Sequence, residues 1–510
     1  MKAILPKRAA VAAVAVALCA AAIGGPSLPA QPASLVTRHS SLVTGGEAPQ
    51  TAPLLRAGIV SDIHVKGDKN RDLQFFRKAL ETFRDERVDA VVIPGDLTDD
   101  GQDEQLGMVA AAWRDVFPGN ALPDGSHVEP IFIYGNHDSS SLSYGVALRN
   151  IKTAAARWGG EEEGRRHLAA YDEAGTWRRV FGEDWAPVFA KSVKGYVFVG
   201  CHWGHEEKAG PWIEAHAEAL GLRDASGRPF FYVQHPHPGG TVQTAHGEFA
   251  WGNDGGVATR ALAAYPNAIA LSGHSHYPLT DTQSIWQGEF TSVNCSSSAY
   301  LGLRRGRDNG AWDSGTGGPV PVAPRFWYGR HCMVMDVFAD RVAFRRLDLV
   351  KGEPLGPDWV CPLPSCVDAA SRPYAFDASE ARSAAPQFPE GAAASVSMRR
   401  GKDRSGAECD IVAVSFAAAR SSGPDGRLFE YEVTAENTAW GIVRICCQKR
   451  VLSKAFAHSA ESEPTGAVEC LFRLDELPEG TPVRFAIRPL NCFGLSGLPI
   501  RTDPVSLPLE

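Results

Sequence analysis

Carboxylate, amide and imidazole side chains occur in this chain directly after short apolar runs. Five such runs end in residues able to bind a metal ion, which in chain order are Asp62 and His64, Asp96 and Asp99, Asn136, His137 and Asp138, His235 and His237, and His274 and His276. A short apolar run that stops at a turn predicts a buried strand, and open α/β sheets place ligands at the carboxyl ends of their strands. In D-x-H and H-x-H, alternation along an extended backbone places both side chains on one side. The sequence therefore predicts a cluster of donors at a sheet edge.

The central run is VVIPGDLTD, residues 91–99. Gly95 permits a sharp turn, so Asp96 projects from a fixed strand end and is a good candidate to bridge two cations. A single Asp after a strand is more often a turn or helix cap, and the prediction therefore depends on all five runs. Their donors are oxygen and imidazole nitrogen with no thiolate, which suits Zn, Mn or Fe(II) better than Mg or Ca.

Periodicity predicts the elements that position these donors. Apolar residues recur at helical spacing over 72–87, between strands predicted at 55–60 and 90–94, and this βαβ unit requires parallel strands. Further helices are predicted over 105–116 and 211–219. Further strands are predicted at 194–199, 289–293, 332–338 and 341–347.

The ordered series D-x-H, G-D-x-x-D, G-N-H-D, a single strand-end His and G-H-x-H resembles the calcineurin-like metallophosphoesterases, here in a secreted bacterial-type form. The resemblance covers roughly residues 54–349 and includes all five blocks in order. It implies an α/β (α+β) four-layer sandwich, in which two mixed β-sheets are flanked by helices and the metals lie at the sheets' edge. We expect the three strands after 289 to close the second sheet.

The resemblance also implies a role for each candidate ligand. The first metal ion would be held by Asp62, His64 and His276, the second by Asn136, His235 and His274, and Asp96 would bridge both. Two divalent ions (Mn, Zn or Fe) would clamp the phosphoryl oxygens, and one would lower the pKa of a bound water so that its hydroxide attacks phosphorus.

Two further residues of the G-N-H-D block are predicted to be catalytic. His137 would protonate the leaving alkoxide or stabilise the phosphoryl oxygens, and Asp138 or another carboxylate would set its tautomer. Asp99 fits better as a residue that orients a ligand His or caps a helix. His235 is favoured as a ligand because it directly follows its strand. His237 stays an alternative, since the family often has Pro two residues after the ligand and here Pro follows at once.

Length and composition indicate an ordinary globular protein of two or three domains. The chain has 510 residues, of which 44% are hydrophobic and 22% charged, and its net charge is −8. No Lys/Arg-rich patch interleaved with aromatic residues occurs, so a basic nucleic-acid-binding surface is not expected. We assign residues 54–350 to the metallophosphoesterase domain and the Pro-rich residues 351–375 to a linker. Residues 376–510, with short strands and frequent turn signals, are predicted to form a smaller all-β sandwich, and 477–494 resembles the late hairpin of fibronectin type III domains.

The N-terminus has the pattern of a secretory signal peptide. Lys2, Lys7 and Arg8 precede an apolar run of about 15 residues, which is short for a membrane span. We predict a signal peptide over 1–30 and a flexible leader over 31–53; the alternative is an uncleaved membrane anchor. Export would place the protein in the periplasm, at the cell surface or outside the cell. There, cysteines such as Cys361 and Cys366 can pair as disulfides.

The leading hypothesis is an exported, binuclear-metal-dependent phosphoesterase acting on phosphate mono- or diesters, either small molecules or a surface polymer. The alternative is a cell-surface protein that binds carbohydrate or protein and whose metal site is structural. Hydrolysis by metal-stripped and metal-restored protein distinguishes the two. Trp203, Trp251 and Tyr277 are candidates to stack on a base or sugar and equally candidates for packing. Substrate identity and oligomeric state do not follow from the sequence.

Overall fold

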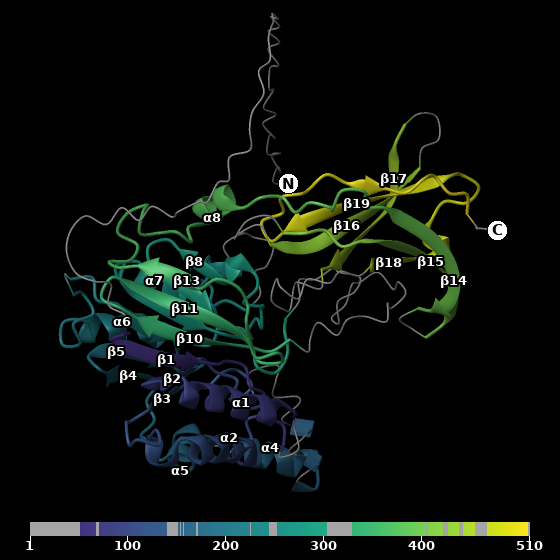
Figure 1. Ribbon diagram of the computed structural model, residues 1–510. Coiled ribbons are helices and arrows are strands. Elements are labelled where there is room, and N and C mark those ends of the chain that lie inside the picture. Colours follow the sequence, from purple (N-terminus) through teal and green to yellow (C-terminus); the bar gives the residue numbers. More distant parts are fainter. Residues whose placement is uncertain are drawn as a thin grey trace, which may run out of the picture. The chain divides into compact units, whose positions relative to one another are not determined.

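The computed structural model describes residues 52–67, 71–139, 151–152, 155–156, 158–169, 172–224, 226–243, 252–302, 329–403, 406–421, 427–437, 442–453 and 467–507. These residues contain two larger sheets with helices and, C-terminal to them, two smaller sheets (Figure 1). The signal peptide and leader predicted over 1–53 lie almost entirely outside the described residues.

The first sheet has the strand order β12-β11-β10-β1-β2-β3, and β13 also pairs with β11. Its strands are β1 (Leu55–Ile59), β2 (Ala90–Ile93), β3 (Glu129–Phe132), β10 (His331–Val337), β11 (Arg341–Asp348), β12 (Glu353–Pro354) and β13 (Trp359–Pro362). β1, β2 and β3 pair in parallel, whereas β10 pairs antiparallel with β1. Because parallel strands end at the same edge, the residues that follow β1, β2 and β3 are brought together there.

Two sequence expectations about this sheet are wrong. β10 and β11 do not close the second sheet, because β10 pairs with β1 over Leu55↔Val337 to Ile59↔Met333. Part of the predicted linker also belongs to the first sheet, since β12 and β13 both pair with β11. Trp359 and Cys361 of β13 alternate into the core, while the prolines at the ends of these short strands are tolerated on a sheet edge.

Helices cover the outer face of the first sheet (Figure 1). They are α1 (Arg71–Asp85) and α2 (Asp103–Val116), and Trp177 of α5 (Glu173–Phe181) joins the same apolar cluster. The short 3₁₀ turn η1 (Pro118–Asn120) follows α2, and α4 (Glu161–Ala169) precedes α5. The apolar stripe predicted for the first helix is buried on α1, where Phe76, Leu80 and Phe83 have no exposed surface. Together with Trp113 of α2 they pack against the outward side chains of β2 and β10. The predicted βαβ unit is therefore confirmed.

The second sheet has the order β4-β5-β6-β7-β9-β8. Its strands are β4 (Val188–Val193), β5 (Tyr196–Cys201), β6 (Phe230–Val233), β7 (Ala268–Ser272), β8 (Ile285–Gln287, after the turn η3, Thr282–Ser284) and β9 (Thr291–Asn294). β5, β6, β7 and β9 are parallel to one another. The helices α6 (Glu206–His216) and α7 (Val257–Leu262) pack on its outer face through Ile213 and Leu262. α6 begins five residues before the predicted helix and contains Pro211.

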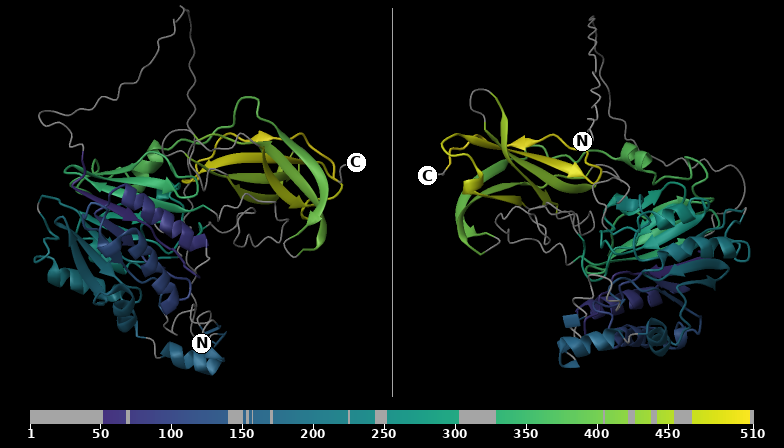
Figure 2. Two further views of the ribbon diagram at one scale, coloured as in Figure 1. Left: turned by 60° about the horizontal axis from the view of Figure 1, so that its bottom comes forward. Right: turned by 180° about the vertical axis from the view of Figure 1, so that it is seen from behind.

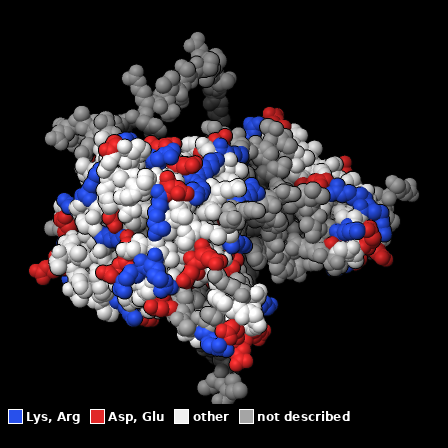
Figure 3. Space-filling model, turned by 90° about the horizontal axis from the view of Figure 1, so that it is seen from below, with Lys and Arg blue, Asp and Glu red and all other residues white. Residues whose placement is uncertain are grey.

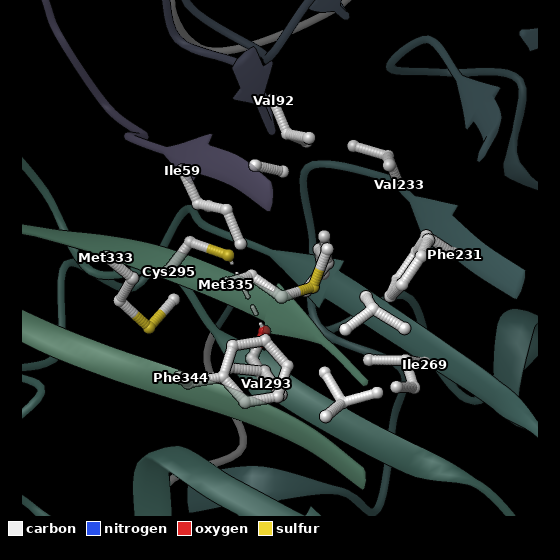
Figure 4. Close-up of a cluster of buried hydrophobic side chains, with 14 of the residues drawn as sticks. Ile59, Val92, Phe231, Val233, Ile269, Val293, Cys295, Met333, Met335 and Phe344 are labelled. Carbon is white, nitrogen blue, oxygen red and sulfur yellow. Dashed lines mark hydrogen bonds between the residues drawn. The ribbon is translucent and has the colours of Figure 1, made fainter. Parts of the chain in front are cut away.

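The inner faces of the two sheets share one apolar core. Figure 4 shows Ile59, Val92, Met335 and Phe344 of the first sheet beside Phe231, Val233, Ile269 and Val293 of the second. All eight side chains are fully buried. Each such side chain contributes roughly 1.5–3 kcal/mol relative to its exposed state. This core fixes the two sheets against each other, so that the strand ends of both reach one edge.

The C-terminal residues form two antiparallel sheets, β14-β15-β18 and β17-β16-β19-β20 (Figure 2). Their strands are β14 (Ala394–Lys402), β15 (Glu408–Ala417), β16 (Leu428–Asn437), β17 (Arg444–Leu452), β18 (Ala467–Arg473), β19 (Val483–Asn491) and β20 (Ile500–Arg501), with the helix α8 (Phe376–Arg382) before them and the turn η8 (Leu474–Glu476) after β18. Val414 and Phe472 of one sheet and Tyr431 and Phe485 of the other belong to a common apolar cluster. The predicted all-β region is therefore present.

The cysteines of the described residues are all free thiols. Cys361 lies in the core between the sheets, whereas the Sγ of Cys366 faces Thr291 Oγ1 at 3.6 Å. The disulfide considered for these two cysteines is thus not formed. On the face shown in Figure 3, acidic and basic side chains are interspersed with uncharged ones.

Candidate metal centre

Seven donor side chains follow strands whose carboxyl ends meet at one edge of the two sheets. Their order is Asp62 and His64 after β1, Asp96 after β2, Asn136 after β3, His235 after β6, and His274 and His276 after β7. All seven are buried. Backbone hydrogen bonds tie neighbouring loops together, because His64 N donates to the Asp96 carbonyl (3.1 Å) and Gly273 N donates to the His235 carbonyl (2.9 Å).

The backbone at the donors is strained. Five of the seven have positive φ angles, namely Asp62 (50°), His64 (51°), Asp96 (52°), His274 (69°) and His276 (56°). Residues other than glycine adopt such angles at a cost of about 1–3 kcal/mol each, and they persist only where the surrounding structure enforces them. The strain is therefore concentrated at the donor-bearing loops.

Two glycines make room for the carboxylates. A Cβ atom on Gly135 would overlap Oδ1 of Asp96, and a Cβ on Gly273 would overlap Ser61 Oγ and Oδ2 of Asp62. Any side chain at either position would displace a donor carboxylate. The glycines of the G-N-H-D and G-H-x-H blocks thus serve close approach between loops.

One group of donors consists of Asp62, His64, Asp96 and His276. His276 Nε2 lies 2.9 Å from Asp62 Oδ1, and His64 Nε2 lies 3.1 Å from His276 Nε2 and 3.5 Å from Asp96 Oδ2. The second group consists of Asp96, His235 and His274. His235 Nε2 lies 3.2 Å from Asp96 Oδ2 and 3.1 Å from Asn136 Oδ1. Asp96 is common to both groups.

The donor set suits divalent metal ions. Nδ1 of His235 lies 2.7 Å from the Pro94 carbonyl and Nδ1 of His276 lies 3.0 Å from the Tyr300 carbonyl. A carbonyl only accepts, so Nδ1 carries the proton and Nε2, which faces the other donors, has its lone pair available for a metal. Imidazole nitrogen and carboxylate oxygen without thiolate match Zn, Mn and Fe(II).

Electrostatics keep both carboxylates ionised. Burial raises the pKa of Asp62, but the His276 and His235 side chains together bring it down to about 2. Burial likewise opposes ionisation of Asp96, yet His235 and His137 hold its pKa well below the ordinary value. Burial lowers the pKa of His235, whereas Asp96 raises it to about 9. Without metal the site is balanced by imidazolium, and metal binding would release protons.

His137 is not one of the seven donors described above, but with His64 and Asp99 it forms a third group that could hold a metal ion. Its backbone N donates to Asp96 Oδ1 (2.9 Å), and its Nδ1 donates to the Asp99 carbonyl (2.9 Å). Its ring lies edge-on to His64 with centroids 4.5 Å apart, and its side chain keeps 14% exposure. Asp99 Oδ1 lies 3.3 Å from His64 Nδ1, so Asp99 is placed to orient that ligand.

Asp138 is placed differently from the expectation. Its carboxylate accepts four hydrogen bonds, from Leu97 N, Thr98 N, Thr98 Oγ1 and Gly135 N, at 2.8–3.0 Å. Burial and the nearby Asp96 raise its pKa to about 7, while the four donors favour the ionised form. Nδ1 of His137 is hydrogen-bonded to the Asp99 carbonyl and also lies 3.9 Å from Oδ1 of the Asp99 carboxylate. This geometry makes Asp138 a link between the loops after β2 and β3.

The structure distinguishes His235 from His237. His235 lies in the second donor group, whereas both ring nitrogens of His237 face serines, with Nδ1 2.7 Å from Ser272 Oγ and Nε2 2.7 Å from Ser275 Oγ. Burial lowers the pKa of His237 to about 3, so its ring is neutral. His237 is therefore not among the donors.

The three aromatic residues considered for stacking on a base or sugar differ in their positions. Tyr277 is fully buried, Trp251 lies outside the described residues, and Trp203 lies beside the second donor group, 5.3 Å from the His274 ring. His202 is buried among aromatic rings and accepts from Tyr134 N (2.9 Å), which indicates a structural role. Sequence reasoning missed Tyr300, whose ring lies 4.2 Å from His276. No motif marks it, because it follows the last block by many residues.

The comparisons with known proteins concern the N-terminal region. Residues 55–278 match the family model described as calcineurin-like phosphoesterase. No curated protein matches the chain.

Similar solved structures include a dimetal phosphatase from Danio rerio, at 12% identity and a TM-score of 0.35, covering 60% of this chain and 98% of that one. A purple acid phosphatase from yellow lupin (Lupinus luteus) seeds has 13% identity and a TM-score of 0.35, covering 60% of this chain and 53% of that one. The family match and the His/Asp donor cluster agree on the same strand ends. Residues 55–278 therefore form a calcineurin-like phosphoesterase domain, and the protein is a metal-dependent phosphoester hydrolase.

Proposed function

We propose that this protein hydrolyses phosphate mono- or diesters with two divalent metal ions, Mn, Zn or Fe, held by the seven donors. The observation that supports two ions is the position of Asp96. Its Oδ2 lies 3.5 Å from His64 Nε2 in one donor group and 3.2 Å from His235 Nε2 in the other. A carboxylate shared by two donor groups is the arrangement that bridges a metal pair.

In this proposal the metal ions, their ligands and His137 have separate roles. Two divalent cations would supply charge stabilisation of the phosphoryl oxygens and a water of lowered pKa. Asp62 and Asp96 contribute only two negative charges, and Asn136 contributes a neutral oxygen, so the loaded site would keep a positive charge that attracts a phosphate ester. His137, fixed through Nδ1 on the Asp99 carbonyl, would act in its imidazolium form, giving the Nε2 proton to the leaving alkoxide and becoming neutral.

We further propose that the chain is exported to the periplasm, the cell surface or the medium. The support is the sequence pattern of residues 1–30, where basic residues precede an apolar run and then small residues. Among the described residues, no helix is both long and apolar enough to cross a membrane. Export would make small phosphate esters or a phosphate-containing surface polymer accessible as substrates.

For the C-terminal region we propose a fibronectin type III-like sandwich. The support is the apolar cluster shared by its two antiparallel sheets and the β19 strand, Val483–Asn491, within the hairpin sequence 477–494. Tyr431 contributes the buried tyrosine of this core, and its hydroxyl accepts a hydrogen bond from Ala419 N (2.9 Å).

Hydrolysis of bis(p-nitrophenyl) phosphate and p-nitrophenyl phosphate, measured side by side, tests the enzymatic proposal. The mature protein is stripped with chelator, reloaded with Mn or Zn, and compared with Asn136→Ala. We expect metal-dependent turnover that the variant loses, and the ratio of the two rates separates diesters from monoesters. Asn437→Ala, on β16 in the C-terminal region, is the matched control and should keep full activity.

Two outcomes would contradict the proposal. Turnover that survives removal of metal would exclude a metal-dependent reaction at this site. Binding of two ions without turnover of either ester would favour the alternative, a cell-surface binding protein with a structural metal site.

A further inference from the structure

We propose that His237 is a positioning residue that sets the turn carrying His274 and His276 before any metal binds. The inference rests on the proposed role of these two histidines as metal ligands. His237 would act through two serines and would not touch the metal itself.

The geometry joins the two sides of the turn through one buried ring. Ser272 is the last residue of β7, and Ser275 lies between the two candidate ligands. The imidazole of His237, which has no exposed surface, contacts both hydroxyls at 2.7 Å, one from each ring nitrogen. The ring therefore spans residues 272–275 and fixes the distance between them.

The backbone of His237 is itself held in place by hydrogen bonds. His237 N donates to the Gly252 carbonyl (2.8 Å), and the His237 carbonyl accepts from Asp254 N (3.0 Å). Asp254 in turn accepts hydrogen bonds from Gly239 N and Gly256 N (2.9 and 2.8 Å). The turn is thus braced against a part of the chain that contributes no metal donor.

The turn needs such a brace because its backbone is unfavourable. His274 and His276 have φ angles of 69° and 56°, a region that side-chain-bearing residues seldom adopt. A strained turn persists only where contacts with the surrounding structure hold its backbone in that conformation. A turn that relaxes in the absence of metal would have to be reordered on binding, and the affinity for metal would fall accordingly.

Two other contacts of the turn involve side chains of candidate ligands. His274 N donates to the carboxylate of Asp62 (3.1 Å to each oxygen), which is itself a candidate ligand. Nδ1 of His276 donates to the Tyr300 carbonyl, a contact of a ligand ring. The two serine contacts of His237 involve no candidate ligand. His237 is therefore a side-chain brace that is independent of the ligands, beside the backbone bonds from Cys295 N to the Ser272 carbonyl (2.6 Å) and from Gly302 N to the His276 carbonyl (2.7 Å).

Substitutions at His237 can separate its two contacts. An asparagine places its amide near the position of Nδ1 and retains a partner for Ser272, while a glutamine places its amide near Nε2 and retains a partner for Ser275. Because Ser275 is the residue between the ligands, the Nε2 contact carries the effect. We expect His237→Asn and Ser275→Ala to behave alike and His237→Gln to resemble the wild type.

The test is the affinity of the metal-stripped full-length protein for Mn²⁺, measured by equilibrium dialysis with elemental analysis. Thermal stability in chelator is recorded for every variant. We expect His237→Asn and Ser275→Ala to weaken Mn²⁺ binding by roughly 10–100-fold, the range found when groups that orient metal ligands are lost. His237→Gln should lose less than about 3-fold on the same reasoning. Ser284→Ala, another buried serine that bonds the Pro278 carbonyl, is the matched control and should bind Mn²⁺ normally.

Wild-type Mn²⁺ affinity in both His237→Asn and Ser275→Ala would overturn the inference. An equal loss in the Asn and Gln variants that follows their loss of thermal stability would also overturn it, since that indicates a general packing role. If a His237 variant does not fold, Ser275→Ala alone decides between these results. Failure of the wild type to bind any of Mn²⁺, Zn²⁺ and Fe²⁺ would instead refute the proposed function, and this inference with it.

Discussion

The donor-bearing loops and the C-terminal β region differ in backbone strain and in how their acidic side chains are paired. Among the described residues, eleven other than glycine have positive φ, and five of them are metal-donor candidates, whereas none lies beyond Cys366. The donor loops also bury the acids Asp62 and Asp96 side by side. Folding alone gives no reason for either feature, because both destabilise a loop.

Buried acids of the C-terminal region are instead paired with arginines across the sheet. On β16, Glu430 meets Arg450 (2.9 Å) and Glu436 meets Arg484 (2.8 Å). Glu432 between them, whose side chain keeps 14% exposure, accepts from Arg488 of β19 (3.2 Å). These charges are satisfied within the fold and require no ligand. The difference teaches that carboxylates of similar burial can serve a fold in one region and a reaction in another.

The largest effect is expected when a carboxylate is replaced by the corresponding amide in each of the two regions. We expect Asp96→Asn to reduce kcat/KM by at least about 1,000-fold, because a bridging carboxylate controls several kcal/mol of charge stabilisation. Glu432→Gln should leave kcat/KM unchanged and alter the free energy of unfolding by less than about 1 kcal/mol. Ester hydrolysis and urea unfolding measure the two effects. Equal activity of the two variants would break the comparison.

The next largest effect is expected on kcat, from substitution of His137. His137→Ala should lower kcat by about 100-fold, near the lower end for a positioned acid or base, while the Mn²⁺ content of the protein stays the same. Metal analysis and kinetics on one sample separate the two quantities. His127→Ala, at an exposed histidine of the same domain, serves as control and should change neither. A loss of bound metal in His137→Ala would mean that His137 holds an ion.

A smaller effect separates the two roles considered for Asp138. If Asp138 links loops, Asp138→Ala should lower the free energy of unfolding by about 2 kcal/mol in chelator, because the backbone donors of Leu97, Thr98 and Gly135 lose their acceptor. Urea unfolding of the metal-stripped protein gives this value. Unchanged stability with a large loss of kcat would return Asp138 to a catalytic role.

The smallest effect is a pH dependence of folding at His202. Burial lowers the pKa of this histidine to about 3, below its unfolded value of about 6.5. The unfolded chain then binds a proton that the folded chain rejects, so stability should fall as pH drops from about 6.5 towards 3. Between pH 6.5 and 5 the loss is roughly 1.5 kcal/mol. Unfolding of His202→Asn in chelator over this range should lack that component, and an unaltered slope would contradict the assignment.

Sequence alone was sufficient where the signal is local. The apolar stripe of α1, the parallel βαβ unit and the donor residues after the strands are encoded by periodicity and by short motifs, since each depends on neighbours a few residues away. The all-β character of the C-terminal region follows from alternation in strands such as β16 and β19 in the same way. The donor types also limited the metal to ions that accept imidazole and carboxylate.

Long-range contacts decided the rest. Strand pattern does not specify a partner, so the place of β10 beside β1, nearly 280 residues away in the chain, and the pairing of β12 and β13 with β11 required the folded structure. His235 and His237 are the same residue type at the end of one strand, and only the loops after β2 and β7 determine which one meets Asp96 and which one meets Ser272 and Ser275. Asp138 likewise received its partners from the loop after β2. The sequence determines which chemistry a side chain can perform. Which residues it contacts, and therefore which role it takes, depends on packing between distant segments.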